Sequence, residues 1–257
     1  MMVKRFALAL GVASLALLAG CGGSKTETNA TGTIVPTAAP GSVAGKAPPA
    51  GQSWTDVVRN TPDGGVVMGN PDAPLKLIEY GSRSCPHCAR FDAEGFPPLK
   101  AKYIASGKVS YEFRDFPVHD VLDIGPILLG HCVEPALFFP MLDQMMKNQD
   151  TLLGNMDKKL TPADQAALQG KSPNEVATTL AEKIGYLDFV KQRGVPEAKA
   201  RACLADKGAL EALAKNLQTA NTKYQISQTP TFILNGAKLD TVDTWDKLEP
   251  ALKNAGA

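Results

Sequence analysis

The segment Cys85-Pro86-His87-Cys88 constrains this chain more than any other feature, because two thiols separated by two residues can form and break a disulfide. The segment before it, Leu75 to Tyr80, is mostly apolar and predicts a buried strand. The segment after it predicts a helix that begins at Pro86, since proline has no N–H to leave unpaired at the first helical position. Cys85 would then be the N-cap, where free backbone N–H groups and the helix dipole favour the thiolate.

The CxxC motif by itself leaves three kinds of site open: a redox-active dithiol, a zinc or copper site, and an inert disulfide. Metal sites of this kind usually use a second CxxC or an HxxxH pair, and the sequence contains neither. The other two histidines, His119 and His131, belong to no motif, and we interpret them as surface or packing residues. The pattern favours redox chemistry, and we expect no metal and no cofactor.

Residues 1–20 have the pattern of a lipoprotein signal peptide. Lys4 and Arg5 precede an apolar run, Phe6 to Leu18, that is too short to span a bilayer, which takes about 20 residues. The run ends in Leu18-Ala19-Gly20-Cys21, which resembles a bacterial lipobox with Cys21 as the lipidated residue. The alternative is an ordinary signal peptide followed by a chance cysteine. We expect Cys21 to be the mature N-terminus and to hold the chain on a bacterial membrane through its lipid.

Residues 21–53 are predicted to form a flexible tether, because Gly, Ala, Pro, Thr and Ser dominate and large apolar residues are scarce. Such a coil spans on the order of 30 Å.

Without the signal peptide the chain has 25 basic and 26 acidic residues and no basic patch, so nucleic acid is not an expected partner. About 200 residues remain for folding, enough for one domain that carries an insertion.

The order of the predicted elements indicates an α/β fold. Strand patterns cover residues 66–68, 75–80, 108–115 and 231–234, and Asn235-Gly236 predicts a hairpin turn into a return strand at Lys238-Leu239. Helix patterns cover residues 54–60, 86–104 with a break at 95–98, 124–147 with breaks near Pro135 and Pro140, 172–184 with a capping box, 207–224 and 244–254, and a further helix opens at 195–197. We predict a thioredoxin-like domain at 54–119 and 205–257, interrupted by a helical insertion at 120–204.

Two of the five cysteines, Cys132 and Cys203, remain once Cys21 and the CxxC pair are assigned. In an oxidising compartment we expect them to form a structural disulfide. The alternative is two separate buried thiols, since the sequence does not show which cysteines are close together.

Several motifs in the same order resemble the DsbA family of extracytoplasmic thiol oxidoreductases, and more closely its lipid-anchored, thioredoxin-fold members. They are Gly69-Asn70-Pro71-Asp72-Ala73-Pro74, Cys85-Pro86-His87-Cys88, Phe113-Arg114-Asp115-Phe116-Pro117, Ala202-Cys203-Leu204 and Gln228-Thr229-Pro230-Thr231-Phe232. The resemblance covers roughly residues 62–257. It implies a thioredoxin fold with an inserted helical subdomain.

The resemblance also implies roles for individual residues. Cys85 would be the exposed nucleophile and Cys88 the cysteine that resolves the mixed disulfide. Thr229-Pro230 would be the cis-proline loop whose backbone pairs with substrate. Glu79 occupies the position of a buried acid six residues before the first cysteine, where a raised pKa would suit it to accept the proton of Cys88; the alternative is a carboxylate that escapes to the sheet edge.

His87 lies between the two thiols, at the second position of the predicted helix. Its imidazole would stabilise the Cys85 thiolate by a hydrogen bond or by charge, which makes the disulfide a stronger oxidant. The alternative is a histidine that only fills a solvent-exposed helix position.

The resemblance leads us to expect a membrane-anchored monomer that oxidises cysteines of exported proteins and is re-oxidised by a membrane redox partner. One alternative is a disulfide reductase or isomerase of the same fold. Another is a periplasmic metal-binding or chaperone module whose CxxC does not exchange electrons.

Overall fold

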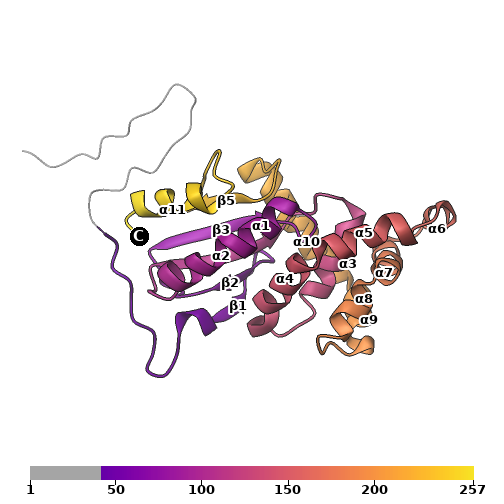
Figure 1. The fold of residues 1–257 in the computed structure, drawn as a ribbon, viewed down its shortest axis with the longest axis horizontal. Coiled ribbons are helices and arrows are strands. Elements are labelled where there is room, and N and C mark those ends of the chain that lie inside the picture. The colour runs from indigo at the N-terminus through magenta and orange to yellow at the C-terminus, as the bar shows by residue number, and fades with distance from the viewer. Residues whose placement is uncertain (1–41) are drawn as a thin grey trace, which may run out of the picture. The chain divides into compact units, whose positions relative to one another are not determined.

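The computed structural model describes residues 42–257, without the side chains of residues 156 and 157, and its centre is a six-stranded mixed sheet (Figure 1). The strands are β1 (Val58–Asn60), β2 (Val66–Met68), β3 (Leu75–Gly81), β4 (Val109–Asp115), β5 (Thr231–Leu234) and β6 (Ala237–Lys238). They lie in the order β1-β2-β4-β3-β5-β6. β3 and β4 run parallel, and every other neighbouring pair is antiparallel. The predicted signal peptide, Cys21 and the tether up to residue 41 lie outside the described residues.

β3 lies in the middle of this sheet, and it is buried, as its apolar sequence predicts. Leu77 pairs with a residue of β4 on one side and a residue of β5 on the other, and Leu75, Leu77 and Tyr80 are buried. The strand ends at Gly81, where a Cβ atom would come within 2.5 Å of Phe113 Cε2. Glycine therefore lets the chain leave the strand closely packed against β4 and lead directly into the CxxC segment.

Helices cover both faces of the sheet and form a block beside it (Figure 1). They are α1 (Pro86–Glu94), α2 (Phe96–Pro98), α3 (Val121–Gly130), α4 (Phe138–Lys147), α5 (Gln149–Lys159), α6 (Pro162–Ala167), α7 (Pro173–Ile184), α8 (Tyr186–Lys191), α9 (Glu197–Leu204), α10 (Lys207–Thr219) and α11 (Trp245–Asn254). Shorter helical segments are η1 (Trp54–Asp56), η2 (Leu99–Ile104), η3 (Pro135–Leu137) and η4 (Ala220–Tyr224).

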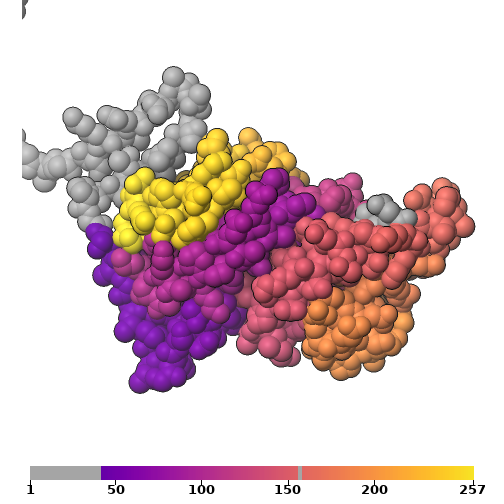
Figure 2. Space-filling model, viewed as in Figure 1, coloured from indigo at the N-terminus to yellow at the C-terminus, as the bar shows by residue number. Residues whose placement is uncertain are grey.

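Three clusters of buried apolar side chains hold these elements together. The first joins one face of the sheet to α1, α4 and α11, and it includes Cys88, Phe91 and Leu248. The second lies inside the block formed by α3 to α9, drawn from pink to orange in Figure 2. The third joins Tyr80 on the other face of the sheet to Tyr224 of η4. The CxxC helix is thus packed between the sheet and α4 of the helical block.

Most predicted elements are present, and two of the differences have local causes. The capping box at Ser172 is confirmed, with Ser172 Oγ accepting from Glu175 N. Residues 58–60 were predicted to be helical but form β1, because they pair with β2 across the turn at 61–65. The break expected near Pro140 is wrong, since Pro140 lies in the first turn of α4, where its missing N–H costs nothing. Helices α5, α6 and α8 were not predicted.

The first described residues contact the folded part of the chain, although they lie within the predicted tether. Val43 N–H donates to Gly256 O at 2.7 Å, and Trp54 Nε1 donates to Lys46 O at 2.6 Å. Within residues 42–257, no helix is long and apolar enough to cross a membrane alone. The segments Val121–Gly130 and Pro135–Lys147 reach that length and apolarity only together, and the pair is bent by 119° at the break between them.

Candidate active site

Cys85 is the N-cap of α1 and Pro86 is its first residue, as the sequence predicts. The Cys85 backbone is extended, with φ −90° and ψ 119°, so its side chain lies at the open end of the helix. Both thiols of the motif are free, and both are buried: Cys85 is 6% exposed and Cys88 is 0% exposed. The nucleophile proposed from the sequence is therefore only just accessible, while its partner is fully enclosed.

The two thiols differ sharply in their acidity. The pKa of Cys85 falls to about 5, mainly because the Cys88 thiol donates a hydrogen bond to it, with smaller contributions from the Thr229 side chain and the backbone N–H groups of Cys88 and His87. Burial opposes this shift. The pKa of Cys88 lies well above its ordinary value, chiefly because of burial, and the hydrogen bond to Cys85 and the nearby Glu79 add to the effect. The reduced site at neutral pH thus holds a thiolate at Cys85 and a thiol at Cys88.

Glu79 is buried on β3, beneath the dithiol. Because β3 is a central strand, the alternative of a carboxylate that escapes to the sheet edge is wrong. Tyr111 on β4 donates its hydroxyl to Glu79 Oε2 at 2.6 Å. Burial raises the pKa of Glu79 to about 8, against the opposing effect of the Tyr111 hydrogen bond. Glu79 is therefore mostly protonated at neutral pH, and it can exchange a proton with a neighbouring group of similar pKa.

The Thr229–Pro230 peptide bond is cis and lies against Cys85. Cys85 Sγ lies 3.3 Å from Thr229 O, across 144 residues of sequence. The two segments meet because Thr231, the first residue of β5, pairs with Tyr80 on β3, which leads into the CxxC motif. The backbone of the Thr229-Pro230 loop thus lies beside the nucleophilic sulfur, as the family resemblance implies.

His87 is exposed on α1, and its imidazole makes no hydrogen bond to any described residue. Its contribution to the low pKa of Cys85 comes from its backbone N–H. A role for the imidazole itself remains a prediction.

Comparison with known proteins assigns the chain to a family. The family model described as thioredoxin matches residues 61–254, most of the chain. The chain belongs to the thioredoxin family.

Relatives of this thioredoxin-family chain have names that refer to disulfide formation or exchange. A Rickettsia bellii protein named as a protein-disulfide oxidoreductase is 28% identical over 175 residues, which make up 68% of this chain and 58% of that protein. A disulfide bond formation protein D from Bacillus cereus is 44% identical over 111 residues, or 38% of this chain and 51% of that protein. The chain spans little more than half the length of these two relatives.

Solved structures share the architecture. A protein-disulfide isomerase from Novosphingobium aromaticivorans matches with a TM-score of 0.69 and 30% identity, covering 74% of this chain and 96% of that structure. The alpha-DsbA1 protein of Wolbachia pipientis matches with a TM-score of 0.58 and 23% identity, covering 74% and 90%. These likenesses confirm the predicted thioredoxin fold with a helical insertion.

Sequence reasoning missed several groups around the thioredoxin-family dithiol. Asp92 follows Cys88 by one helical turn, and that spacing was the available signal. Burial and the charge of Asp143 raise the pKa of Asp92 to about 7. His119, which we interpreted as a surface or packing residue, is exposed but hydrogen-bonds Ser84, the residue before Cys85. No local pattern marks that contact.

Arg83, two residues before Cys85, does not add charge to the surface of the site. It is buried and forms an ion pair with Asp115 at the end of β4. The other carboxylate oxygen of Asp115 lies 2.7 Å from His131 Nε2 on the helical block. Burial, and then the charge of Arg83, lower the pKa of His131 to about 3, so His131 is neutral and packs the junction between sheet and helices.

Cys132 and Cys203 form a disulfide, and the alternative of two separate thiols does not occur in this structure. Their Cα atoms are 5.9 Å apart and they are separated by 71 residues in sequence. Cys132 lies within the apolar cluster of the helical block, and the partly buried Cys203 packs against it. Within the described part of the chain, no group of three or more His, Cys, Asp or Glu side chains is arranged to hold a metal ion.

Proposed function

We propose that this protein is an extracytoplasmic thiol–disulfide oxidoreductase that oxidises pairs of cysteines in exported proteins. The observation that carries the proposal is the unequal acidity of its dithiol, with the pKa of Cys85 near 5 and that of Cys88 well above its ordinary value. A low pKa stabilises the reduced protein, and a protein that is stable when reduced readily passes its disulfide to a substrate. The names of the relatives and of the 30% identical structure support the same chemistry.

The first step begins from the Cys85–Cys88 disulfide. A substrate thiolate attacks Cys85 Sγ, a bond forms between the substrate sulfur and Cys85, and the bond between Cys85 and Cys88 breaks with its electron pair on Cys88. Because the pKa of Cys88 is high, its sulfur takes up a proton. Protonated Glu79 is suited to supply it, and ionised Glu79 to accept it when the protein is re-oxidised.

The second step releases the product. A second substrate thiolate attacks the substrate sulfur of the mixed disulfide, and Cys85 leaves as a thiolate. The low pKa of Cys85 makes it a good leaving group. The substrate has then lost two electrons and the protein has gained them as its reduced dithiol. The Thr229-Pro230 loop is the surface on which we expect the substrate backbone to lie, and a membrane redox partner would restore the disulfide.

A reductase or isomerase is the second candidate, because one 30% identical structure is named as a protein-disulfide isomerase. Equilibration of the Cys85/Cys88 couple with glutathione buffers separates the two. We expect a reduction potential near −120 mV, typical of a strong oxidant, whereas a value near −270 mV would identify a reductase. A protein that binds zinc stoichiometrically and shows no reversible couple would support the non-enzymatic metal-binding alternative instead.

The proposal places the protein outside the cytoplasm, held on a membrane by lipid on Cys21. The support is the signal-peptide and lipobox pattern of residues 1–21. Intact-mass spectrometry of protein extracted from bacterial membranes is the test. An N-terminus other than Cys21, or an unmodified Cys21, would overturn this part of the proposal without affecting the dithiol chemistry.

A further inference from the structure

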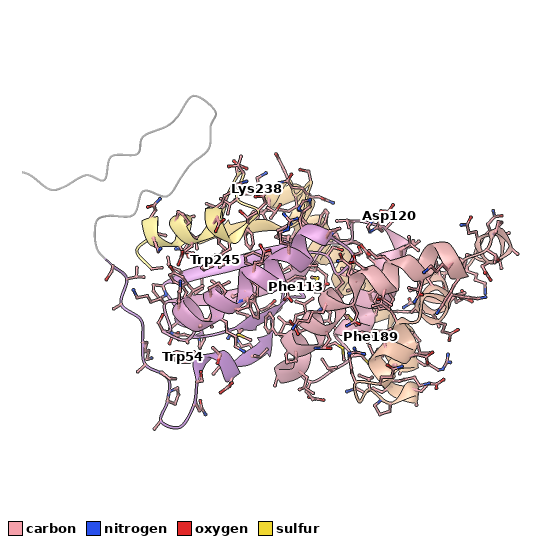
Figure 3. All side chains as sticks on the ribbon, viewed as in Figure 1. Trp54, Phe113, Asp120, Phe189, Lys238 and Trp245 are labelled. Carbon is pink, nitrogen blue, oxygen red and sulfur yellow. A yellow bond between two sulfur atoms is a disulfide. The ribbon has the colours of Figure 1, made fainter. Side chains whose placement is uncertain are left out.

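The loop Ser82-Arg83-Ser84, which leads into Cys85, is buried and tied to the helical block by side-chain hydrogen bonds. Each of its three residues is only 2% exposed. His119 Nδ1 lies 2.8 Å from Ser84 Oγ, Ser84 Oγ lies 2.9 Å from Ser82 Oγ, and Ser82 Oγ lies 3.2 Å from Asp123 Oδ2. We call these four side chains the serine relay. His119 lies in the loop between β4 and α3, next to Asp120, which is labelled in Figure 3.

The direction of every hydrogen bond in the serine relay follows from counting protons. The carboxylate of Asp123 can only accept, so Ser82 gives its one hydroxyl proton to Asp123. Ser84 must then donate to Ser82, and this uses the only hydroxyl proton of Ser84. His119 must therefore donate Nδ1–H to Ser84. The donation runs one way, from the exposed imidazole through two buried hydroxyls to a buried carboxylate.

Asp123 is the fixed end of the serine relay. It lies in the first turn of α3 and is 3% exposed. Besides the Ser82 hydroxyl, its Oδ2 accepts from Val118 N at 2.7 Å and from His119 N at 3.0 Å. Three donors on one oxygen satisfy a buried charge that would otherwise be costly. The same carboxylate thus orders the loop that carries His119 and the loop that carries Cys85.

The serine relay reaches the dithiol through the backbone of Ser82. Ser82 N–H donates to Cys88 Sγ at 3.5 Å, and this bond lowers the pKa of Cys88 against the larger effect of burial. In the reduced site the Cys88 thiol donates its proton to the Cys85 thiolate, so the Cys88 sulfur is more electron-rich than in the disulfide and accepts the Ser82 N–H bond more strongly. The bond therefore favours the reduced dithiol over the disulfide. Ser82 Oγ also accepts from Ser84 N at 3.1 Å, so the side chain of Ser82 is held from both sides while its N–H faces the sulfur.

We propose that the serine relay is a positioning device that holds Ser82 N–H against Cys88 Sγ and so shifts the Cys85/Cys88 equilibrium toward the reduced dithiol. His119, Ser84, Ser82 and Asp123 are positioning residues that act through the backbone of Ser82. This inference rests on the proposed redox function, and it assigns part of the tuning of that site to the helical block.

The test compares the glutathione equilibrium constants of Ser82→Ala, Ser84→Ala and His119→Ala, read from the fraction of thiols that react with a maleimide polymer. Ser82→Ala should favour the disulfide about fivefold, which corresponds to a potential about 20 mV more negative. His119→Ala should give about a twofold change in the same direction. His119→Asn should have the equilibrium constant of the unmodified protein, because the asparagine amide can supply a donor where Nδ1–H of His119 lies. The double variant Ser82→Ala/His119→Ala should shift the equilibrium constant little further than Ser82→Ala alone. Both substitutions interrupt the same series of hydrogen bonds.

Val118→Ala is the matched control, because Val118 is exposed beside His119 and its side chain is no part of the serine relay. An unchanged equilibrium constant in Ser82→Ala, or an equal shift in Val118→Ala, overturns the proposal. If Ser82→Ala does not fold, the equilibrium constant of Ser84→Ala takes its place in this test. If the unmodified protein has no reversible couple, the proposed function fails and the inference fails with it. If the unmodified couple titrates normally and the variants match it, only the inference fails.

Discussion

Cys85 and Cys132 belong to different cysteine pairs and are buried to a similar depth, but they do opposite things. Cys85 is 6% exposed and Cys132 is 3% exposed, yet Cys85 is a free thiol of low pKa while Cys132 is bonded to Cys203. Hydrogen-bond donors surround Cys85 at the start of α1. Cys132 lies in an apolar cluster, and its sulfur is 3.5 Å from a backbone carbonyl, Lys199 O. The donors around a sulfur, and not its burial alone, separate a reactive cysteine from a structural one.

The largest expected effect separates the two pairs by function. Cys85→Ser should reduce the oxidative refolding of a reduced substrate protein to the uncatalysed rate, because no mixed disulfide can form. The double variant Cys132→Ala/Cys203→Ala should keep its rate within about twofold at a temperature where it is folded. An equal loss of activity in both variants would show that the second pair also takes part in the chemistry.

Glu79 should make the stability of the protein depend on pH in an unusual direction. The pKa of Glu79 is raised from 4.5 to about 8, so the folded state holds this proton more tightly than the unfolded state. Its stabilising contribution is complete below about pH 4.5 and is lost as the pH rises toward 8. Relative to wild type, Glu79→Gln should therefore gain stability over this range, by at most about 5 kcal/mol.

Urea unfolding of both proteins between pH 4.5 and 8.5 measures this difference in the free energy of unfolding. A constant offset between the two proteins is expected, because the new amide is buried next to Tyr111. A difference that does not change with pH would show that Glu79 is ionised in the folded protein throughout this range.

Removal of the second disulfide should cost stability rather than activity. The bond closes a loop of 71 residues, and the entropy model gives about 4 kcal/mol for its effect on the unfolded chain. Cys132→Ala/Cys203→Ala should lower the free energy of unfolding by that order in urea denaturation at pH 7. A loss below about 1 kcal/mol would indicate that the packing of α3 against α9 holds the helical block together without the bond.

The smallest expected effect is that of the His87 side chain. Because the contribution of His87 to this low pKa comes from its backbone N–H, His87→Ala should raise the pKa of Cys85 from about 5 by less than about 1 and make the potential slightly more negative. The pH dependence of alkylation of the reduced protein by iodoacetamide measures the change. Glu94→Ala, at the far end of α1, is the control. A larger rise would show that the imidazole acts on the thiolate directly.

Local pattern was enough to predict the elements that build the dithiol. The apolar run of β3, proline at the first position of α1 and the Ser172 capping box each act within a few residues, so they are readable from sequence. The place of Glu79 in a central strand followed only from the pairing of β3 with both β4 and β5, which no local pattern fixes.

The sequence by itself determined the reactive motif, most of the order of strands and helices, and the start of α1 at Cys85-Pro86. Tertiary structure alone decided which distant groups meet: Cys132 with Cys203, Thr229 O with Cys85, and Asp123 with Ser82. The physical reason is the sequence separation over which each kind of interaction acts. Backbone preference and side-chain periodicity act over a few residues, whereas contacts across 41, 71 or 144 residues depend on how complete layers pack.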